Sequence, residues 1–368
     1  MINRPNIILL TVDALRADHC SAFGYDRETT PFLESFGQRA IEFRQAISVS
    51  SHTREAMPTL LSGYRPASFA ANGFRAVEQP LLAERLDSAG YRTQGFHSNP
   101  YLSRAYGFDR GFRTFYDDLL LGQNKFLALA QRALEKFVFN RGEYYARADE
   151  INRRSLKQLD SVNDTQPIFL WNHYMDVHGP YHAPKRHWAD QPLSASDAES
   201  LYRRSWSDPD SITENEQRLL LDSYDDEIRW LDEQLASLFE EFRERNLLDE
   251  SLIIITSDHG DAFGEHGYYT HPRYLHDSLL RVPLIISPPN GGEGTIKSQV
   301  STLDVVPTIT AYAGVSADFS GTHLIGDSEQ PTSGHEIVFA SATGENENDA
   351  IRRFAGRRRD AKVITEVN

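Results

Sequence analysis

Three side chains that could bind a metal ion stand directly after two apolar runs. Asp13 follows the run 6–12, and Asp258 and His259 follow the run 251–257. Two carboxylates and one imidazole nitrogen suit calcium, magnesium, manganese or zinc, and these residue types do not choose among the four ions. An aspartate at a strand end is otherwise often a turn residue. The turn interpretation is weaker for the second run, because a buried carboxylate without a partner is costly.

A possible nucleophile lies in the polar segment 50–55, which runs into a short helical pattern that ends at Gly63. The N-terminus of a helix offers free N–H groups and a partial positive charge, which bind an anionic ester and help to hold a hydroxyl as an alkoxide. A divalent ion would complete the activation of that hydroxyl. Thr53 or Ser51 can therefore be interpreted as a nucleophile, or simply as the cap of this helix.

Strands and helices alternate along most of the chain. The pattern predicts strands over 6–12, 91–96, 167–171, 251–257 and 279–287, and helices over 30–40, 80–89, 213–246 and twice between 124 and 159. This alternation predicts an α/β fold, with a mostly parallel, doubly wound central sheet and helices on both faces. Because the carboxyl ends of parallel strands share one edge, Asp13, Asp258 and His259 are expected to meet there.

Three local expectations concern single elements. Thr30 is expected to cap the helix 30–40, with Pro31 at its first position. The acidic residues of the helix 213–246 are expected to form its solvated face. The segments 336–341 and 361–365 are expected to pair as a small antiparallel C-terminal element.

Composition limits the class of protein. A chain of 368 residues that is 40% hydrophobic can bury one large core, and we predict a catalytic domain over 1–320 with an appendage over 321–368. Acidic residues outnumber basic ones 53 to 38, and the net charge of -15 disfavours binding to nucleic acid. Cys20 is the single cysteine, so an intramolecular disulfide is excluded and a core thiol is expected. Without a signal sequence or an apolar run of about 20 residues, we expect a cytoplasmic protein with no membrane span.

Several stretches of the chain resemble the sulfatase family within the alkaline phosphatase superfamily. They are Pro5–Asp13, the segment that ends in Leu60–Gly63, Ser257–Asp261 with Gly264–Gly267, Arg281–Ile286 and Asp304–Thr308. Each motif is weak alone, but together they cover the chain to about Gly314 in the expected order. The resemblance implies a sulfatase-like fold and a metal-dependent hydrolase that cleaves small anionic esters of phosphate or sulfate.

The resemblance also implies a role for individual residues. It assigns Asp13, Asp258, His259 and Thr53 to one divalent metal ion. It also makes Thr53 the nucleophile, because the family nucleophile lies ten residues before the glycine that ends its helix, and Gly63 has that relation to Thr53. The expected product of its attack is a covalent threonine ester, which water then hydrolyses.

Three further residues match positions that contact the transferred group. His178 matches a histidine that contacts its oxygens or protonates the leaving group. His271 matches a lysine or histidine that steadies it, and Asn99 matches another residue that contacts its oxygens. Without the resemblance, a histidine in a loop is usually solvated.

The chain departs from the family pattern around the nucleophile. Sulfatases usually carry a cysteine or serine that becomes formylglycine, and Thr53 cannot form that aldehyde hydrate. Met57 stands where arginine is usual, and Arg54 is the candidate to supply the missing charge at the substrate. We therefore prefer phosphoester chemistry, on diesters or phosphonates, to sulfate hydrolysis. Pro58 leaves a second possibility, that the helix begins at Met57 or Pro58 and Thr53 lies on a loop.

The number of metal ions and the class of reaction stay open from the residues alone. Ala14 replaces a second acidic ligand of many family members, so one ion is expected, although Asp176, His182 and His266 could form a second site. The same fold could serve a phosphotransferase, a mutase or an inert protein that binds anions. The alcohol part of the substrate and the oligomeric state do not follow from the sequence.

Overall fold

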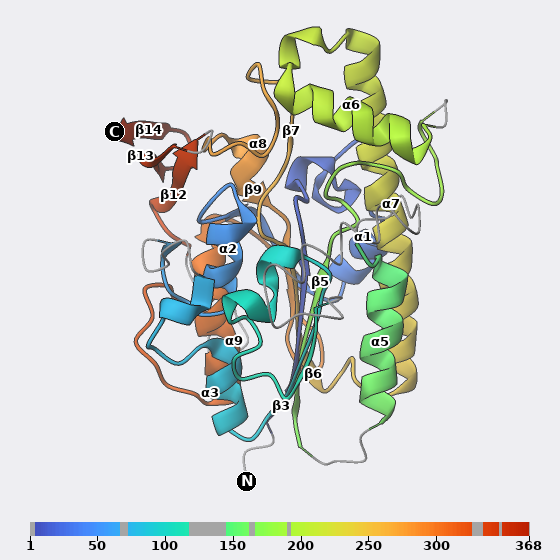
Figure 1. Ribbon diagram of the computed structural model, residues 1–368. Helices are drawn as coiled ribbons and strands as arrows, with labels where there is room; N and C mark the ends of the chain where they lie inside the picture. Colours follow the sequence, from blue (N-terminus) through green and yellow to red (C-terminus); the bar gives the residue numbers. More distant parts are fainter. Residues whose placement is uncertain are drawn as a thin grey trace.

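A mixed sheet forms the centre of the protein in the computed structural model (Figure 1), which describes residues 4–66, 73–117, 145–161, 166–189, 193–325, 334–345 and 348–367. Within these residues the strand order is β11-β2-β10-β6-β1-β5-β3-β4, and β9 pairs with β2. The strands are β1 (Asn6–Val12), β2 (Ile41–Ile47), β3 (Arg92–Phe96), β4 (Thr114–Tyr116), β5 (Ile168–Tyr174), β6 (Ser251–Ser257), β9 (Arg281–Val282), β10 (Leu284–Ser287) and β11 (Gly294–Ser301).

Most neighbouring strands run parallel. β1 is parallel to β5 and β6, β3 is parallel to β4 and β5, and β11 is parallel to β2. β10 is antiparallel to both β2 and β6. The prediction of a mostly parallel α/β sheet is confirmed. The strand predicted over 279–287 is wrong in detail, because this segment contains the end of a short helix, β9 and β10.

Helices cover both faces of the sheet, and each face has its own apolar core (Figure 1). α1 (Pro31–Gly37), α5 (Ala148–Asp160) and α7 (Glu214–Glu244) pack on one face. α2 (Thr53–Leu60), α3 (Leu82–Ser88) and α9 (Val305–Ala313) pack on the other. Along β1, Ile8 and Leu10 point into the first core, and Ile7 and Leu9 point into the second. An apolar run is needed at a strand that is buried on both sides. The first of the two helices predicted between 124 and 159 lies largely outside the described residues.

The strand register brings the candidate ligands to one level. Val12 at the end of β1 lies beside Tyr174 on one side and Ser257 on the other. The next residues along β1 and β6 are Asp13 and Asp258, so both carboxylates emerge at the same edge. The carboxyl ends of parallel strands are where ligands bind in sheets of this kind.

The acidic residues of α7 overturn one prediction. The helix itself and its apolar stripe are confirmed, but four of its acids are buried instead of solvated, with at most 2% exposure: Asp225, Asp226, Glu227 and Asp232. Asp226 accepts hydrogen bonds from the backbone N–H groups of His187 (2.6 Å) and Trp188 (3.1 Å), and Glu227 accepts one from His182 N (2.7 Å). These acids therefore hold the loop that follows β5.

Asp232 has the same role for α1. Thr30 was the expected cap of this helix, but its side chain makes no capping hydrogen bond, and the helix ends at Gly37 instead of near residue 40. The Asp232 carboxylate accepts the N–H groups of Phe32 (2.7 Å) and Leu33 (3.0 Å). A negative charge at a helix N-terminus also interacts favourably with the helix dipole. Asp232, about 200 positions away in the sequence, thus caps the N-terminus of α1.

Replacing Asp226 with alanine is expected to lower the free energy of unfolding by about 2–4 kcal/mol, because the backbone N–H groups of three successive residues, 187 to 189, lose a charged acceptor. The control is Glu240→Ala on the same helix. The side chain of Glu240 is 65% exposed, so its loss should change stability by less than about 0.5 kcal/mol. Urea unfolding followed by circular dichroism measures both values. Equal destabilisation by the two variants would contradict the buried role of Asp226.

A three-stranded antiparallel sheet lies near the C-terminus. Its strands are β12 (Val338–Glu345), β13 (Asn348–Arg357) and β14 (Lys362–Val367), in the order β12-β13-β14. The expected antiparallel element is present, but the two segments expected to pair with each other each pair with β13 instead. Val338 and Ala340 of β12 pack on Ile47 and Leu280 of the main body. The domain boundary near residue 320 stays a prediction.

Two smaller expectations concern burial and membranes. Cys20 is fully buried in the first core, as expected for a core thiol. In the described part of the chain, no helix combines the length and the apolar character that a membrane crossing requires.

Candidate active site

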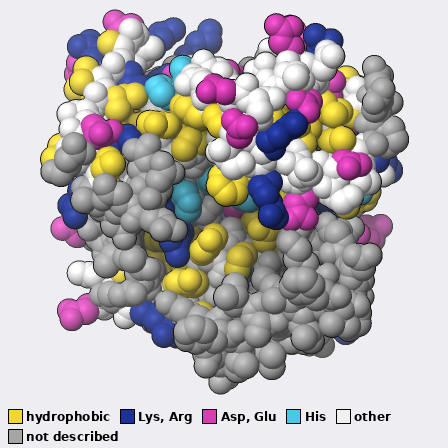
Figure 2. Space-filling model, turned by 45° about the horizontal axis from the view of Figure 1, so that its top comes forward, with side chains coloured by type: hydrophobic (Ala, Val, Ile, Leu, Met, Phe, Trp, Pro, Cys, Tyr) yellow, Lys and Arg dark blue, Asp and Glu magenta, His cyan; other side chains and the backbone are white. Residues whose placement is uncertain are grey.

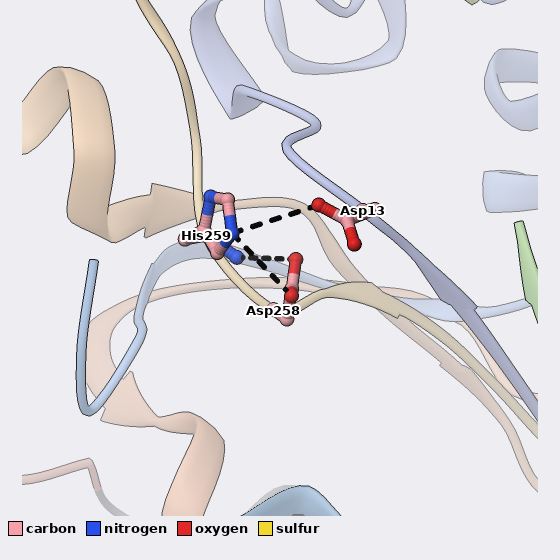
Figure 3. A group of neighbouring side chains, drawn as sticks. All are labelled: Asp13, Asp258 and His259. Carbon is pink, nitrogen blue, oxygen red and sulfur yellow. Dashed lines mark hydrogen bonds and ion pairs between the residues drawn. The ribbon is translucent and has the colours of Figure 1, made fainter. Parts of the chain in front are cut away.

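Asp13, Asp258 and His259 converge where β1 and β6 end (Figure 3). One possible ligand atom from each residue lies within 4.8 Å of the other two, and all three side chains are fully buried. Nε2 of His259 lies 3.6 Å from Asp13 Oδ1 and 3.5 Å from Asp258 Oδ2. Nδ1 of His259 lies 2.9 Å from the carbonyl oxygen of Gly260, so it carries the proton and Nε2 presents its lone pair.

The donor set fits a divalent cation. Among the described residues, Asp13 Oδ1 and Asp258 Oδ2 accept no hydrogen bond although both atoms are buried. Burial and the neighbouring charge of Asp13 raise the pKa of Asp258 well above its usual value. Two buried carboxylates this close repel each other, and a cation between them removes that penalty. Oxygen donors with one imidazole suit magnesium, calcium, manganese or zinc.

The backbone turn after β1 also orients the site. Ala14 has φ of 62°, a left-handed conformation that costs energy for a residue with a side chain. This turn directs the N–H of Ala14 to Asp258 Oδ1 at 3.2 Å. The carbonyl of Ala14 accepts the hydroxyl of Tyr224 on α7 at 2.8 Å, which holds the turn in place.

Thr53 is the first residue of α2, and its hydroxyl reaches the same group. Its Oγ1 lies 3.0 Å from His259 Nε2 and 3.3 Å from Asp13 Oδ2. His52 is the N-cap, and its Nδ1 accepts the N–H of Arg54 at 3.3 Å. The alternative in which the helix begins at Met57 or Pro58 is therefore wrong. α2 contains the proline near its end and still presents Thr53 at the positive end of its dipole.

Asp13 Oδ2 is held by two further side chains. Asn99 Nδ2 donates to it at 2.8 Å, so Asn99 lies at the candidate site, and its expected contact with the oxygens of the substrate stays a prediction. His173 Nε2 lies 3.4 Å from the same oxygen. Burial opposes ionisation of Asp13, but the nearby His173 ring outweighs it, and the pKa of Asp13 is held well below its usual range.

His173 is a residue that sequence reasoning missed. It lies in β5 beside Thr11 of β1, and its Nδ1 is 2.9 Å from the Thr11 hydroxyl. The signal was present as a histidine inside a buried strand, where a polar ring must find partners. The neighbouring strand that supplies those partners could not be read from the sequence.

His271 and His178 face each other beside this group, with ring centroids 4.9 Å apart. His271 Nδ1 lies 3.2 Å from the buried Asp261 carboxylate, which also accepts the hydroxyl of Tyr181. Burial opposes protonation of His271, but this ion pair outweighs it and raises the pKa of His271. Burial lowers the pKa of His178, whose Nδ1 lies 2.7 Å from the carbonyl oxygen of Gly179. Nε2 of His178 is therefore its acceptor atom.

Arg54 is the predicted residue that least resembles a substrate contact. It is exposed, and its guanidinium lies over the ring of Tyr101 at 4.6 Å. Met57 is fully buried in the second core, so no basic side chain replaces the usual arginine at that position.

The alternative second metal site does not assemble. Asp176 pairs with Arg147 at 3.5 Å, and His266 stacks on His276 with ring centroids 3.8 Å apart. In the described residues, the group Asp13, Asp258 and His259 is the one that could hold an ion. Figure 2 shows histidine side chains near the middle of the face above the strand ends, with hydrophobic and basic side chains beside them.

Comparison with known proteins gives consistent matches. The sulfatase family model matches residues 5–315. The choline-sulfatase of Rhizobium meliloti (strain 1021) is 25% identical over 352 residues, which cover 86% of this chain and 69% of that protein. The arylsulfatase of Clostridium perfringens (strain 13 / Type A) is 22% identical over 364 residues, with coverage of 85% and 76%. The crystal structure of the phosphonate monoester hydrolase of Agrobacterium radiobacter has the same fold, with a TM-score of 0.77, 18% identity and coverage of 98% and 87%.

Proposed function

This chain belongs to the sulfatase family and is a hydrolase of sulfate or phosphate esters, and we propose that it cleaves phosphate diesters or phosphonate monoesters in preference to sulfate esters. The observation that carries this preference is Thr53 at the nucleophile position, close to His259 and Asp13. Threonine has no route to formylglycine, on which sulfate hydrolysis in this family usually depends. The buried Met57 in place of arginine supports the same conclusion.

In the proposed reaction, the Thr53 oxygen attacks phosphorus in line with the departing alcohol. The hydroxyl donates to Asp13 Oδ2, 3.3 Å away, which orients the Thr53 oxygen, and the hydroxyl proton passes to water as the attack proceeds. The bond between phosphorus and the alcohol oxygen breaks, and a threonine ester remains. Water then attacks the phosphorus of this ester, and the Thr53 oxygen leaves. A divalent cation held by Asp13, Asp258 and His259 would stabilise negative charge on the Thr53 oxygen and on the ester.

The two histidines take different parts in this proposal. His271 is paired with Asp261, so it carries a fixed positive charge that holds the oxygens of the transferred group. His178 protonates the departing alcohol. Burial lowers the pKa of His178, but a bound anionic ester adds the negative charge that favours its protonated form.

Replacing each histidine with alanine separates these parts. His178→Ala is expected to lower kcat/KM for an alkyl ester by about 10²–10⁴-fold, and much less for a nitrophenyl ester, whose leaving group needs no proton. His271→Ala should lower both values by similar factors, because the charge on the transferred group is the same in both substrates. Steady-state kinetics with matched ethyl and nitrophenyl phosphodiesters measures the two ratios. An equal loss on both esters in His178→Ala would contradict its role as the acid.

A substrate panel tests the function itself. Nitrophenyl sulfate, nitrophenyl phosphate, bis(nitrophenyl) phosphate and nitrophenyl phenylphosphonate share one leaving group, so kcat/KM compares only the transferred group. We expect the diester or the phosphonate to exceed the sulfate by at least about tenfold, which corresponds to 1.4 kcal/mol in the barrier. A higher value for the sulfate would instead favour a sulfuric ester hydrolase, in agreement with the names of the choline-sulfatase and arylsulfatase relatives.

A phosphotransferase is the second candidate function. It would use the same threonine ester but pass the group to an alcohol instead of water. Hydrolysis in water labelled with heavy oxygen distinguishes the two, because the label enters the released anion only when water is the acceptor. We expect the label in the product.

A further inference from the structure

A helix outside the matched motifs, α6 (Ala195–Ser207), lies above the carboxyl ends of the strands (Figure 1). It contacts β8 (Tyr269–Thr270), which directly precedes His271. Leu201 and Ser205 are buried on its inner side, and Arg203 is paired with Glu199 on the outer side. Tyr202 lies between these sides and is half-buried. The helix therefore brings one aromatic ring toward the candidate site.

The ring of Tyr202 lies directly on the backbone that follows His178. A Cβ atom added to Gly179 would lie 2.1 Å from Cε2 and 2.5 Å from Cδ2 of Tyr202. Any side chain at position 179 would displace the ring, because contacts this short do not occur between carbon atoms. Tyr181 packs against the ring edge to face, with centroids 5.7 Å apart and planes at 81°. Tyr202 is thus held in a fixed position by its neighbours.

A second tyrosine ring packs against His178. The ring of Tyr145 lies 6.1 Å from the ring of His178 at 79°, and the ring of Tyr202 lies 6.4 Å from it at 55°. Tyr145, Tyr202 and His178 are all half-buried, whereas Tyr181 behind them is buried. The rings of Tyr145 and Tyr202 are therefore partly exposed beside His178, the histidine that is proposed to protonate the leaving alcohol.

The hydroxyl of Tyr202 can donate a hydrogen bond to a ligand. No residue in the described part of the chain accepts or donates a hydrogen bond at this oxygen. Burial and the charge of Asp261 raise the pKa of Tyr202 well above its usual value, so the hydroxyl keeps its proton. A partly buried phenol normally hydrogen-bonds to something, and here a bound ligand can supply the acceptor.

We propose that Tyr202 and Tyr145 form the subsite for the alcohol part of the ester, that this subsite prefers alcohols with a ring to short acyclic alcohols, and that the Tyr202 hydroxyl donates a hydrogen bond to the bound ester. Fixed aromatic side chains bury the flat face of a ring at little entropic cost. A two-carbon chain covers far less of that surface. The assignment rests on the proposed function, since it takes His178 as the group beside the leaving alcohol.

Binding to the Thr53→Ala variant tests this subsite without turnover. The probes are phenyl phosphate, a methyl glucopyranoside phosphate and ethyl phosphate, measured by calorimetry in saturating Mn²⁺. Both ring-bearing probes are expected to bind about tenfold more tightly than ethyl phosphate. Adding Tyr202→Leu should reduce this preference to less than about threefold. Adding Tyr202→Phe should keep the preference but weaken all three probes about fivefold, the worth of one hydrogen bond.

Tyr64→Phe is the matched control, because the Tyr64 hydroxyl already accepts a hydrogen bond from Arg85 at 3.0 Å. It should leave all three affinities unchanged. Equal affinities for the three probes, or a preference that survives Tyr202→Leu, would overturn the subsite. Unchanged affinities in Tyr202→Phe would overturn the hydrogen bond. A difference between the phenyl and the glucopyranoside probes identifies the kind of ring. Absence of turnover by the parent chain would defeat the proposed function and leave these binding results standing.

Discussion

The Thr53→Ala variant is expected to lose at least about 10⁴-fold in kcat. The proposed reaction begins with the attack of the Thr53 oxygen, and the other groups of the site only assist that attack. The Thr53→Ser variant keeps a hydroxyl at the first position of α2, within the same reach of His259 and Asp13, and should retain activity within about tenfold of the parent. Steady-state kinetics on the best ester of the substrate panel measures both.

Thr59→Ala is the matched control for Thr53. Thr59 is a fully buried threonine on the same helix, and its hydroxyl donates to the carbonyl of Glu55 at 3.3 Å. Its loss should change kcat less than about threefold. Mass spectrometry after an acid quench should find the transferred group on Thr53 in the parent. Turnover that survives Thr53→Ala, or a covalent adduct on another residue, would contradict the assignment of the nucleophile.

The Asp258→Asn variant is expected to lose the metal ion and at least about 10³-fold in kcat/KM, because one of the two buried carboxylates no longer carries a charge. Relative to the parent, the variant should be more stable without the metal ion and less stable with it. Without metal, Asp258→Asn should unfold at a higher temperature than the parent, since burial and the charge of Asp13 already disfavour the Asp258 carboxylate. With an ion at 100 times its dissociation constant, the parent alone should gain about 2.7 kcal/mol.

Thermal unfolding with and without a chelator measures this pair of effects. Asp232→Asn is a suitable control, because Asp232 is also buried but caps α1 away from the candidate ligands. Its ion-dependent gain in stability should equal that of the parent. An Asp258→Asn protein that still gains stability from the ion would show that the cation binds elsewhere.

The side chains around the candidate ligands matter for the proposed metal site as much as the candidate ligands do. Asp13 is approached by Asn99, His173 and Thr53 on one oxygen, which leaves the other oxygen toward Asp258 and His259. Partners of this kind fix the orientation of a ligand and are costly to remove. The proposed chemistry therefore depends on β5, α2 and the segment after β3 as well as on the two strands that the acids follow.

Local patterns predicted the central elements correctly. The apolar runs of β1, β5 and β6 have the composition of strands that are buried on both faces, and the 3.6-residue period of α7 gave its length to within two residues at each end. The polar residues that follow these strands could be assigned to one sheet edge. These features depend on burial along a single element, which the order of residues records directly.

Local patterns did not predict that the acidic residues of α7 are buried. Asp225, Asp226 and Glu227 have the polarity of a solvated helix face, but loops from other parts of the chain cover them. A polar residue looks the same in the sequence whether water or a backbone N–H is its partner. The predicted exposure was wrong for that reason.

The sequence by itself determined the α/β class and the strand ends after which Asp13 and Asp258 follow, and it left open whether Thr53 begins a helix or lies on a loop. Only the tertiary structure decided which side chains meet: Asp13 with Thr53 from 40 positions away, His173 behind Asp13, and Tyr202 on the backbone of Gly179. Secondary structure follows from interactions between near neighbours, whereas a site is made by contacts between distant segments. Their distances depend on how the whole core packs, and no short stretch of residues contains that information.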